Sequence, residues 1–225
     1  TTTTTVTHPD GSTTVTTRAK NGVSSVVETS TSGKVTAEVK VPDAVASQAA
    51  AAGETVVLAM PAVPVTSDKT RAATVTMDLP ADTAVKVEIP VADVTAGTVA
   101  VLVGADGSEK IIRTSSVTEN GLAVTLSDGD TVKIVDNSKT FADVPASHWA
   151  SGSVAFATSR ELFSGTSETT FDPDSDMTRA MIVTVLARCY GVDTTTGGEW
   201  YEAGAQWAVE NGVSDGTNLD NSVTR

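Results

Sequence analysis

Aromatic side chains are missing from the first 140 residues of this chain. All three Trp, both Tyr and all four Phe lie at or after Phe141. A core before that point must be built from aliphatic side chains and threonine. Such a shift in composition is typical of a domain boundary, which we place near residues 138–141.

Cysteine and long apolar runs are also scarce. The one cysteine, Cys189, excludes an internal disulfide, and its place on the apolar side of an expected helix favours a buried structural thiol. No run of 18 apolar residues occurs, so no membrane-spanning segment is predicted, and no signal peptide is visible. We expect the chain to be a piece of a longer polypeptide.

Catalytic groups are sparse as well. His8 and His148 are far apart, and no Ser–His–acid or paired-carboxylate arrangement can be argued from the sequence. We therefore expect no enzyme activity, no cofactor and no metal. The net charge of −13 disfavours nucleic acid and anionic membranes as partners.

The first forty residues contain thirteen threonines, punctuated by turn signals at Pro9-Asp10-Gly11, Asn21-Gly22 and Ser32-Gly33. The β-branched runs between these turns recur about every 11 residues, which predicts short strands joined by tight turns. Residues 1–34 have too few large apolar side chains for a core of their own. They are predicted to form a Thr-rich β-hairpin stalk, with a disordered linker as the alternative.

Residues 35–138 alternate between apolar and polar positions, with turn signals every 8–12 residues. This pattern predicts an antiparallel β-sandwich, interrupted by one helix near Ala44–Ala52. Its acidic residues are scattered singly, so we expect a spacer or an adhesion-type domain there.

From Phe141 onward the apolar period lengthens to three or four residues, which predicts helices near 148–160, 179–190 and 200–211. Thr178 is a suitable N-cap and Gly191 a suitable helix stop. The segment Trp149 to Gly165 aligns with Trp200 to Gly216 at a constant offset of 51 residues. The chain therefore contains a helical repeat whose second copy stops early.

The motifs of the first copy carry a family resemblance. They are Phe141-Ala142-Asp143-Val144, Trp149-Ala150, Leu162-Phe163-Ser164-Gly165, Phe171-Asp172-Pro173 and Met177-Thr178-Arg179-Ala180. Together they resemble the S-layer homology motif. The resemblance implies an α-helical S-layer homology module over residues 139–225, with a complete motif at 141–190 and a truncated one at 200–225.

The family typically arranges three such motifs as a pseudo-threefold helical bundle. It binds secondary cell-wall polysaccharide, often through a terminal pyruvylated sugar, in grooves between motifs. The resemblance implies glycan-binding roles for seven residues: Asp143, Trp149, Gly165 and Arg179 in the first copy, and Trp200, Gly216 and Arg225 in the second.

This sequence departs from the family pattern in both copies. Met181 stands where an acidic residue usually follows Thr-Arg-Ala, and Val192 and Thr194 replace the Phe and Asp that open a motif. The incomplete second copy should leave apolar faces exposed. We expect the module either to self-associate through them or to pack against the β domain.

Arg179 can also be considered without the family. A cation in the first turn of a helix is disfavoured by about 0.3–1 kcal/mol, which a bound anion would offset. The alternative is a salt bridge to Asp172, Asp174 or Asp176. These three have the spacing that opens a calcium loop, but Met177 and Val183 replace the Gly and Glu that it requires.

The aromatic and glycine candidates have structural alternatives too. Trp149 and Trp200 could stack on a sugar or pack in a core, and Gly165 and Gly216 could serve turns rather than ligand approach. We conclude that the chain is a mixed, multidomain and non-catalytic surface protein, attached outside a bacterial cell to its wall. The alternatives are an adhesin-like interaction protein and the anchoring tail of a secreted enzyme.

Overall fold

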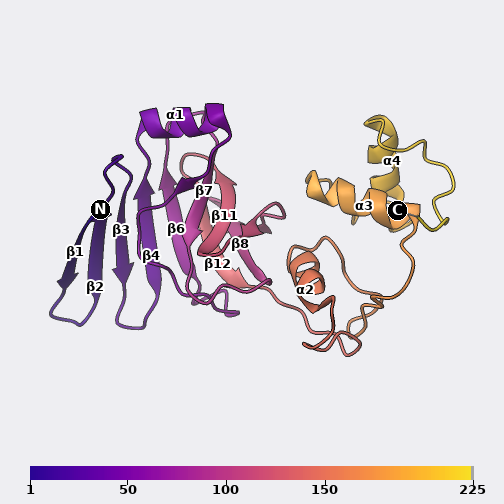
Figure 1. Cartoon of the computed structure of the whole chain (residues 1–225), viewed down its shortest axis with the longest axis horizontal. Helices are drawn as coiled ribbons and strands as arrows, with labels where there is room; N and C mark the ends of the chain where they lie inside the picture. Colours follow the sequence, from indigo (N-terminus) through magenta and orange to yellow (C-terminus); the bar gives the residue numbers. More distant parts are fainter. Residues whose placement is uncertain (224–225) are drawn as a thin grey trace. The chain divides into compact units, whose positions relative to one another are not determined.

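The computed structural model describes residues 1–223 and divides into two compact units, one over residues 1–138 and one from Lys139 onward. The division falls where the aromatic residues begin. The first unit is β-rich and the second is helical (Figure 1). No helix among the described residues is long and apolar enough to cross a membrane.

Two sheets form the first unit. The larger has eight strands in the order β1-β2-β3-β4-β6-β12-β8-β9 and the smaller has four in the order β10-β11-β7-β5. The bounds in the larger sheet are β1 Thr2–Thr7, β2 Thr13–Arg18, β3 Ser24–Thr29, β4 Val35–Lys40, β6 Ala73–Asp78, β8 Thr98–Val103, β9 Glu109–Ile111 and β12 Thr131–Asp136. Those in the smaller sheet are β5 Val56–Val57, β7 Val85–Pro90, β10 Ser116–Val117 and β11 Gly121–Leu126.

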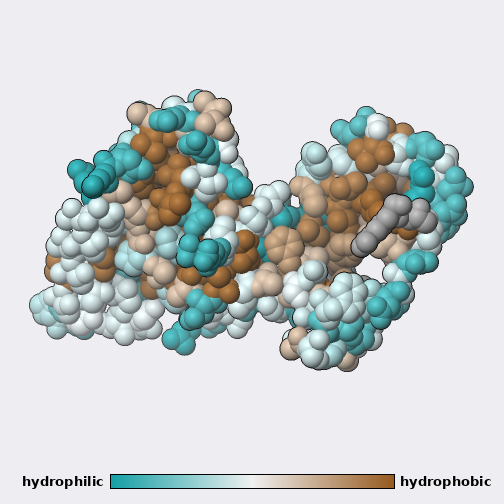
Figure 2. Space-filling model, in the orientation of Figure 1, coloured by the Kyte–Doolittle hydropathy of each residue, from teal (hydrophilic) through white to brown (hydrophobic). Residues whose placement is uncertain are grey.

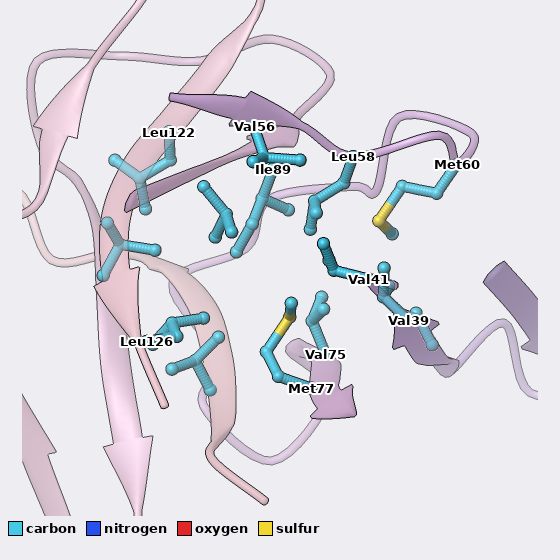
Figure 3. Close-up of a cluster of buried hydrophobic side chains, with 14 of the residues drawn as sticks. Val39, Val41, Val56, Leu58, Met60, Val75, Met77, Ile89, Leu122 and Leu126 are labelled. Carbon is cyan, nitrogen blue, oxygen red and sulfur yellow. The ribbon is translucent and has the colours of Figure 1, made fainter. Parts of the chain in front are cut away.

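Aliphatic side chains from both sheets fill the core of this unit (Figure 3). Val75 and Met77 of β6 are buried together with Ile89 of β7 and Leu122 of β11. Along β6 and β7 these positions alternate with polar ones, as expected for strands with one buried face. The absence of aromatics is therefore met by many small and medium side chains, chiefly valine.

Strand direction differs from the expectation in two places. Most pairs are antiparallel, but β4 pairs with β6 and β5 pairs with β7 in parallel. The connection from β4 to β6 spans residues 41–72 and includes helix α1 (Asp43–Ala52), which confirms the expected helix. A purely antiparallel sandwich was thus wrong, because alternation reveals which face is buried but not the direction of the neighbouring strand.

The threonine-rich segment is ordered in strands and belongs to the large sheet. Strands β1 to β4 begin at residues 2, 13, 24 and 35, which gives an 11-residue period. Gly11, Gly22 and Gly33 end the three turns with φ of +92°, +90° and +81°. Each turn is the three-residue hairpin loop that needs a left-handed residue at this place. Residues 1–34 are therefore not a separate compact unit, and the disordered alternative is wrong.

Three helices form the second unit: α2 Ser151–Ser159, α3 Arg179–Cys189 and α4 Glu202–Glu210. They lie within a few residues of the expected positions. The hydroxyl of Thr178 accepts a hydrogen bond from the Met181 N–H at 3.3 Å, which confirms the N-cap. A small core of Phe141, Ala150 and Val154, together with Val144 and Phe171, lies beside α2.

The apolar stripe of α3 is only half buried. Ile182, Val185, Leu186 and Cys189 are partly exposed, so Cys189 is not the buried thiol that we expected. Tyr190 at the end of α3 is 77% exposed. Hydrophobic residues accordingly gather on the visible surface of this unit (Figure 2).

Helices α3 and α4 approach each other at Gly204. A Cβ on this residue would lie 2.7 Å from the Thr184 Cα, closer than real Cβ atoms come to a backbone atom. The contact joins the first copy of the repeat to the second. Gly204 is therefore a packing glycine, and any side chain there would push the two helices apart.

We predict that Gly204→Ala lowers the free energy of unfolding of the second unit by about 1–3 kcal/mol, because overpacking costs about this much. Gly152→Ala in α2 is the matched control, since no atom lies within 4 Å of its Cβ position. It should be neutral or stabilising by up to about 1 kcal/mol, the difference in helix propensity. Thermal or urea unfolding measures both, and equal effects would contradict this packing.

Candidate functional site

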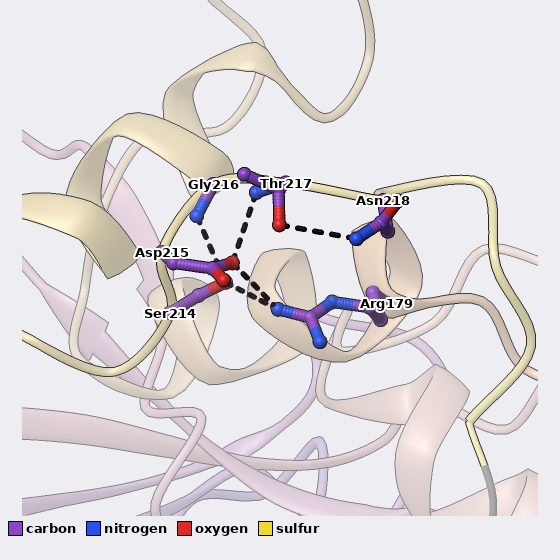
Figure 4. A network of polar contacts seen from close by, with 6 residues as sticks. All are labelled: Arg179, Ser214, Asp215, Gly216, Thr217 and Asn218. Atoms are coloured by element: carbon purple, nitrogen blue, oxygen red, sulfur yellow. Dashed lines mark hydrogen bonds and ion pairs between the residues drawn. The ribbon is translucent and has the colours of Figure 1, made fainter.

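Arg179 lies where the two copies of the repeat meet (Figure 4). Its Nη2 donates to Asp215 Oδ1 at 2.8 Å and to Ser214 Oγ at 3.3 Å, both in the loop after α4. The Arg179 side chain is 37% exposed and that of Asp215 is 66% exposed. An ion pair in such a wet position adds little to stability. The ion pair with Asp215 instead orients the Arg179 guanidinium at the surface.

The loop around Asp215 is held by its own hydrogen bonds. Asp215 Oδ1 accepts the Thr217 N–H at 3.0 Å, and Ser214 Oγ accepts the Gly216 N–H at 3.2 Å. The hydrogen bonds from Thr217 lower the pKa of the Asp215 carboxyl most, and the charge of Arg179 lowers it further. Asp215 is therefore ionised whenever the loop is folded at neutral pH.

The first turn of α3 is satisfied by the second copy. The N–H of Arg179 donates to the Asn221 carbonyl at 3.0 Å and that of Ala180 to the Leu219 carbonyl at 2.9 Å. These N–H groups are normally the ones that a helix offers to an anion. They are occupied here, so the backbone N–H groups at the start of α3 are not free to bind an anion, and anion binding by the Arg179 side chain stays a prediction.

The three aspartates considered as partners of Arg179 do not take that place. Among the described residues, the ion pair of Arg179 is with Asp215. Asp172 instead accepts a hydrogen bond from the Ser175 hydroxyl, within its own loop. Within residues 1–223, no group of three or more His, Cys, Asp or Glu side chains is placed to hold a metal ion.

Asp143 fixes the loop that precedes α3. Its carboxylate accepts the N–H of Phe171 at 3.0 Å and the N–H of Asp172 at 2.7 Å. These backbone hydrogen bonds lower the pKa of the Asp143 carboxyl. Phe171 in turn packs on Phe141, with ring centroids 5.5 Å apart. Asp143 thus positions the loop of the first copy through the backbone.

The two tryptophans named as candidates are exposed. Trp149 is 80% exposed and Trp200 is 52% exposed. The Trp149 ring lies 5.6 Å from that of His148, and the Trp200 ring contacts Tyr201 edge-on at 5.2 Å. Core packing is therefore excluded for Trp149, and both indoles can be reached by a ligand.

The two glycines serve turns. Gly165 has φ of +84° and Gly216 has φ of +74°, conformations that other residues rarely adopt. A Cβ on Gly165 would also lie 2.7 Å from the Phe141 ring, and one on Gly216 would lie 2.8 Å from Val209. Arg225, the last candidate, lies outside the described residues.

A family model provides the deciding comparison for this unit. Residues 140–180 match the S-layer homology domain, a segment that runs from the Asp143 motif into α3. The chain contains an S-layer homology domain. The match ends before α4, so the second copy rests on the internal alignment and on its contacts with α3.

Two curated proteins are similar to parts of the chain. One is the middle cell wall protein of Brevibacillus brevis, 29% identical over 94 residues, which cover 41% of this chain and 9% of that protein. The other is cell surface glycoprotein 1 of Acetivibrio thermocellus, 44% identical over 46 residues, which cover 20% of this chain and 2% of that protein. No solved structure matches the chain.

The chain therefore spans less than a tenth of the length of either relative. The S-layer homology domain and these two relatives indicate a bacterial surface protein that is anchored at the cell wall, outside the cell.

Sequence reasoning missed the residues that hold Arg179. Ser214 and Asp215 align with Phe163 and Ser164 of the first copy. The first copy therefore has no charged residue at either position, and the alignment did not mark Asp215 as a partner for Arg179. Asp215 also lies 36 residues from Arg179. The one available signal was the Ser-Asp-Gly-Thr sequence at 214–217, which is typical of a hydrogen-bonded turn.

We predict that the loop at 171–172 of the S-layer homology domain loosens in acid. The carboxylate of Asp143 has a lowered pKa, so its contribution is complete above the ordinary value of 3.8 and is lost as the pH falls through the folded value. Asp143→Ala should remove the contribution at neutral pH. Hydrogen exchange at the Phe171 and Asp172 amides measures it, with Asp193→Ala, in another loop, as control. Unchanged exchange in Asp143→Ala would contradict this role.

Proposed function

We propose that this cell-wall anchoring protein is non-catalytic and binds secondary cell-wall polysaccharide through Arg179 and the 214–217 loop. The observation that carries the proposal is an exposed guanidinium held between the two copies of an S-layer homology repeat. Grooves between motifs are where this family is expected to bind its glycan. An acidic polymer, including one with pyruvyl groups, supplies the carboxylates that an arginine binds well.

The hydrogen bonds of Arg179 leave room for such a ligand. Among the described residues, the contacts of its guanidinium use Nη2, and its Nε and Nη1 make no hydrogen bond. Nε and Nη1 can each donate a charge-assisted hydrogen bond to a carboxylate oxygen, whereas a parallel, bidentate pair would need Nη2, which Asp215 and Ser214 occupy. Asp215 and Ser214 would fix the orientation of the guanidinium and could accept hydrogen bonds from sugar hydroxyls.

The other candidate residues have two kinds of role: some would contact the glycan directly, and others would hold the loops that surround it. We assign glycan stacking to Trp149 and Trp200, because a flat exposed indole suits the apolar face of a sugar ring. We assign support to Asp143, Gly165 and Gly216, whose contacts are with the protein backbone and neighbouring side chains. Replacing a supporting residue should weaken binding only by loosening a loop.

We predict that Arg179→Ala weakens sedimentation with purified cell walls by about tenfold or more, the equivalent of one charge-assisted hydrogen bond at about 1.5–3 kcal/mol. Arg179→Lys keeps the charge but lacks the planar guanidinium with its separate Nε and Nη1 donors, so it should be intermediate. Arg18→Ala, on an exposed position of the β-rich unit, is the control for charge. Walls stripped of pyruvyl groups should bind wild type and Arg179→Ala alike. Equal binding of both variants to untreated walls would refute the assignment.

The half-buried face of α3 supports a second part of the proposal. Three motifs are typical of the family, and α4 is the last helix among the described residues. We infer that the partly exposed stripe of Ile182, Val185, Leu186 and Cys189 is covered either by further motifs or by self-association of this module.

We expect an extended natural chain with three complete motifs to bind walls more tightly than this chain. Completed grooves add contacts, whereas an incomplete groove exposes apolar surface. Sedimentation of both chains with the same walls measures the difference, and equal binding would contradict the need for further motifs. The fluorescence of a hydrophobic dye, which reports exposed apolar surface, should be lower with the extended chain than with this chain.

A further inference from the structure

Two hairpin turns of the β-rich unit border a groove. The turn between β1 and β2 and the turn between β3 and β4 leave the large sheet at the same end (Figure 1). Both are closed in the same way: the N–H of His8 donates to the Ser12 carbonyl, and the N–H of Ser30 to the Lys34 carbonyl, each at 2.9 Å. The groove between them has a volume of about 340 Å³. Pockets for small ligands begin at about 300 Å³, so a small ligand fits.

The third turn of the series shows that this hairpin does not require polar residues. The turn between β2 and β3 leaves the opposite end of the sheet, and the N–H of Ala19 donates there to the Val23 carbonyl at 2.8 Å. Both of its closing residues are apolar, and Val23 is buried. In the two turns beside the groove, all four closing residues are polar or charged. The polar residues therefore go with the groove and not with the turn type.

Every residue that lines the groove is polar or charged. Most are serine and threonine, whose hydroxyls can both donate and accept hydrogen bonds. The residues among them that can carry a charge are His8, Asp10, Glu28 and Lys34. Two of these four already have partners beside the groove: Nε2 of His8 lies 2.8 Å from Thr14 Oγ1, and Asp10 Oδ1 accepts the Ser12 N–H at 2.9 Å.

Glu28 and Lys34 supply one free charge of each sign. Within residues 1–223, the Glu28 carboxylate and the Lys34 ammonium form no hydrogen bond or ion pair, with each other or with any other group. Glu28 faces Thr36 across the β3–β4 register, and Lys34 lies two residues before Thr36. Since side chains two residues apart point to the same face, at a spacing of about 6.7 Å, both charges lie on one face of the sheet.

We propose that this groove binds a small zwitterion, a ligand that carries an ammonium and a carboxylate in one molecule, as a short peptide does at its two ends. The ammonium pairs with Glu28 and the carboxylate with Lys34, and the hydroxyls of Thr14 and Thr36 bind the polar groups between them. A zwitterion has no net charge, so the net charge of −13 does not repel it. A neutral sugar would leave both free charges without a counter-charge.

The site goes beyond the proposed function, because it gives the β-rich unit a ligand of its own. Binding is weak, since Glu28 and Lys34 are exposed and an ion pair in water changes an affinity only about two- to fivefold. Added salt should weaken it further, because exposed charges are screened. The two hairpins hold the groove open without a ligand, so binding needs no rearrangement of the sheet.

Titration of the isotope-labelled whole chain with glycylglycine, followed by nuclear magnetic resonance at the amides of Thr14, Glu28 and Lys34, tests the site. N-acetylglycylglycine lacks the ammonium and glycylglycine amide lacks the carboxylate, so each should bind about two- to fivefold more weakly than glycylglycine. Glu28→Gln should remove only the preference for a free ammonium. Lys34→Met should remove only the preference for a free carboxylate.

Two matched variants are controls. Glu38→Gln, at an exposed position of β4, and Lys20→Met, in the turn at the opposite end of the sheet, make the same changes in charge and should keep both preferences. The proposal is overturned if glycylglycine shifts none of the three amides, if the blocked peptides or glucose shift them equally at the same concentration, or if Glu28→Gln and Lys34→Met keep both preferences. Because no wall is present, failure of glycan binding at Arg179 would leave these outcomes unchanged.

Discussion

The first turn of α3 is the point on which the helical unit depends. A helix begins with N–H groups that have no partner within the helix, and burying them without partners is costly. Here Thr178 caps one of them, and the carbonyls of Asn221 and Leu219 accept two others. The second copy of the repeat is thereby fastened to the first through the backbone, and the Arg179 side chain is directed to Asp215 as a result.

The glycines follow from the same constraint. With the 219–221 backbone held at the start of α3, α4 must cross α3 closely, and Gly204 permits this at Thr184. Gly216 turns the chain back from α4 toward that junction with a positive φ. Arg179, Asp215 and the loop between α4 and residue 219 are therefore parts of one junction, and not independent surface features.

The β-rich unit has a core without aromatic side chains. Its valines are stacked in rows across the sheet; Val27, Ala37, Val75 and Val132 form one such row. The row continues through the half-buried Val15 of β2 and becomes polar at Thr5 of β1. Burial declines along the same direction, which explains why β1 is exposed on both faces while β4 is buried on one.

Local patterns determined much of this protein. The period of the apolar residues predicted the strands and helices, the 11-residue spacing predicted the hairpins of β1 to β4, and the Thr178 motif predicted the start of α3. These features depend on neighbours within a few residues. The sequence could not decide the parallel pairing of β4 with β6, the exposure of Trp149, or the partner of Arg179, because each depends on segments that are distant in the chain. Only the folded backbone brings residue 215 to residue 179.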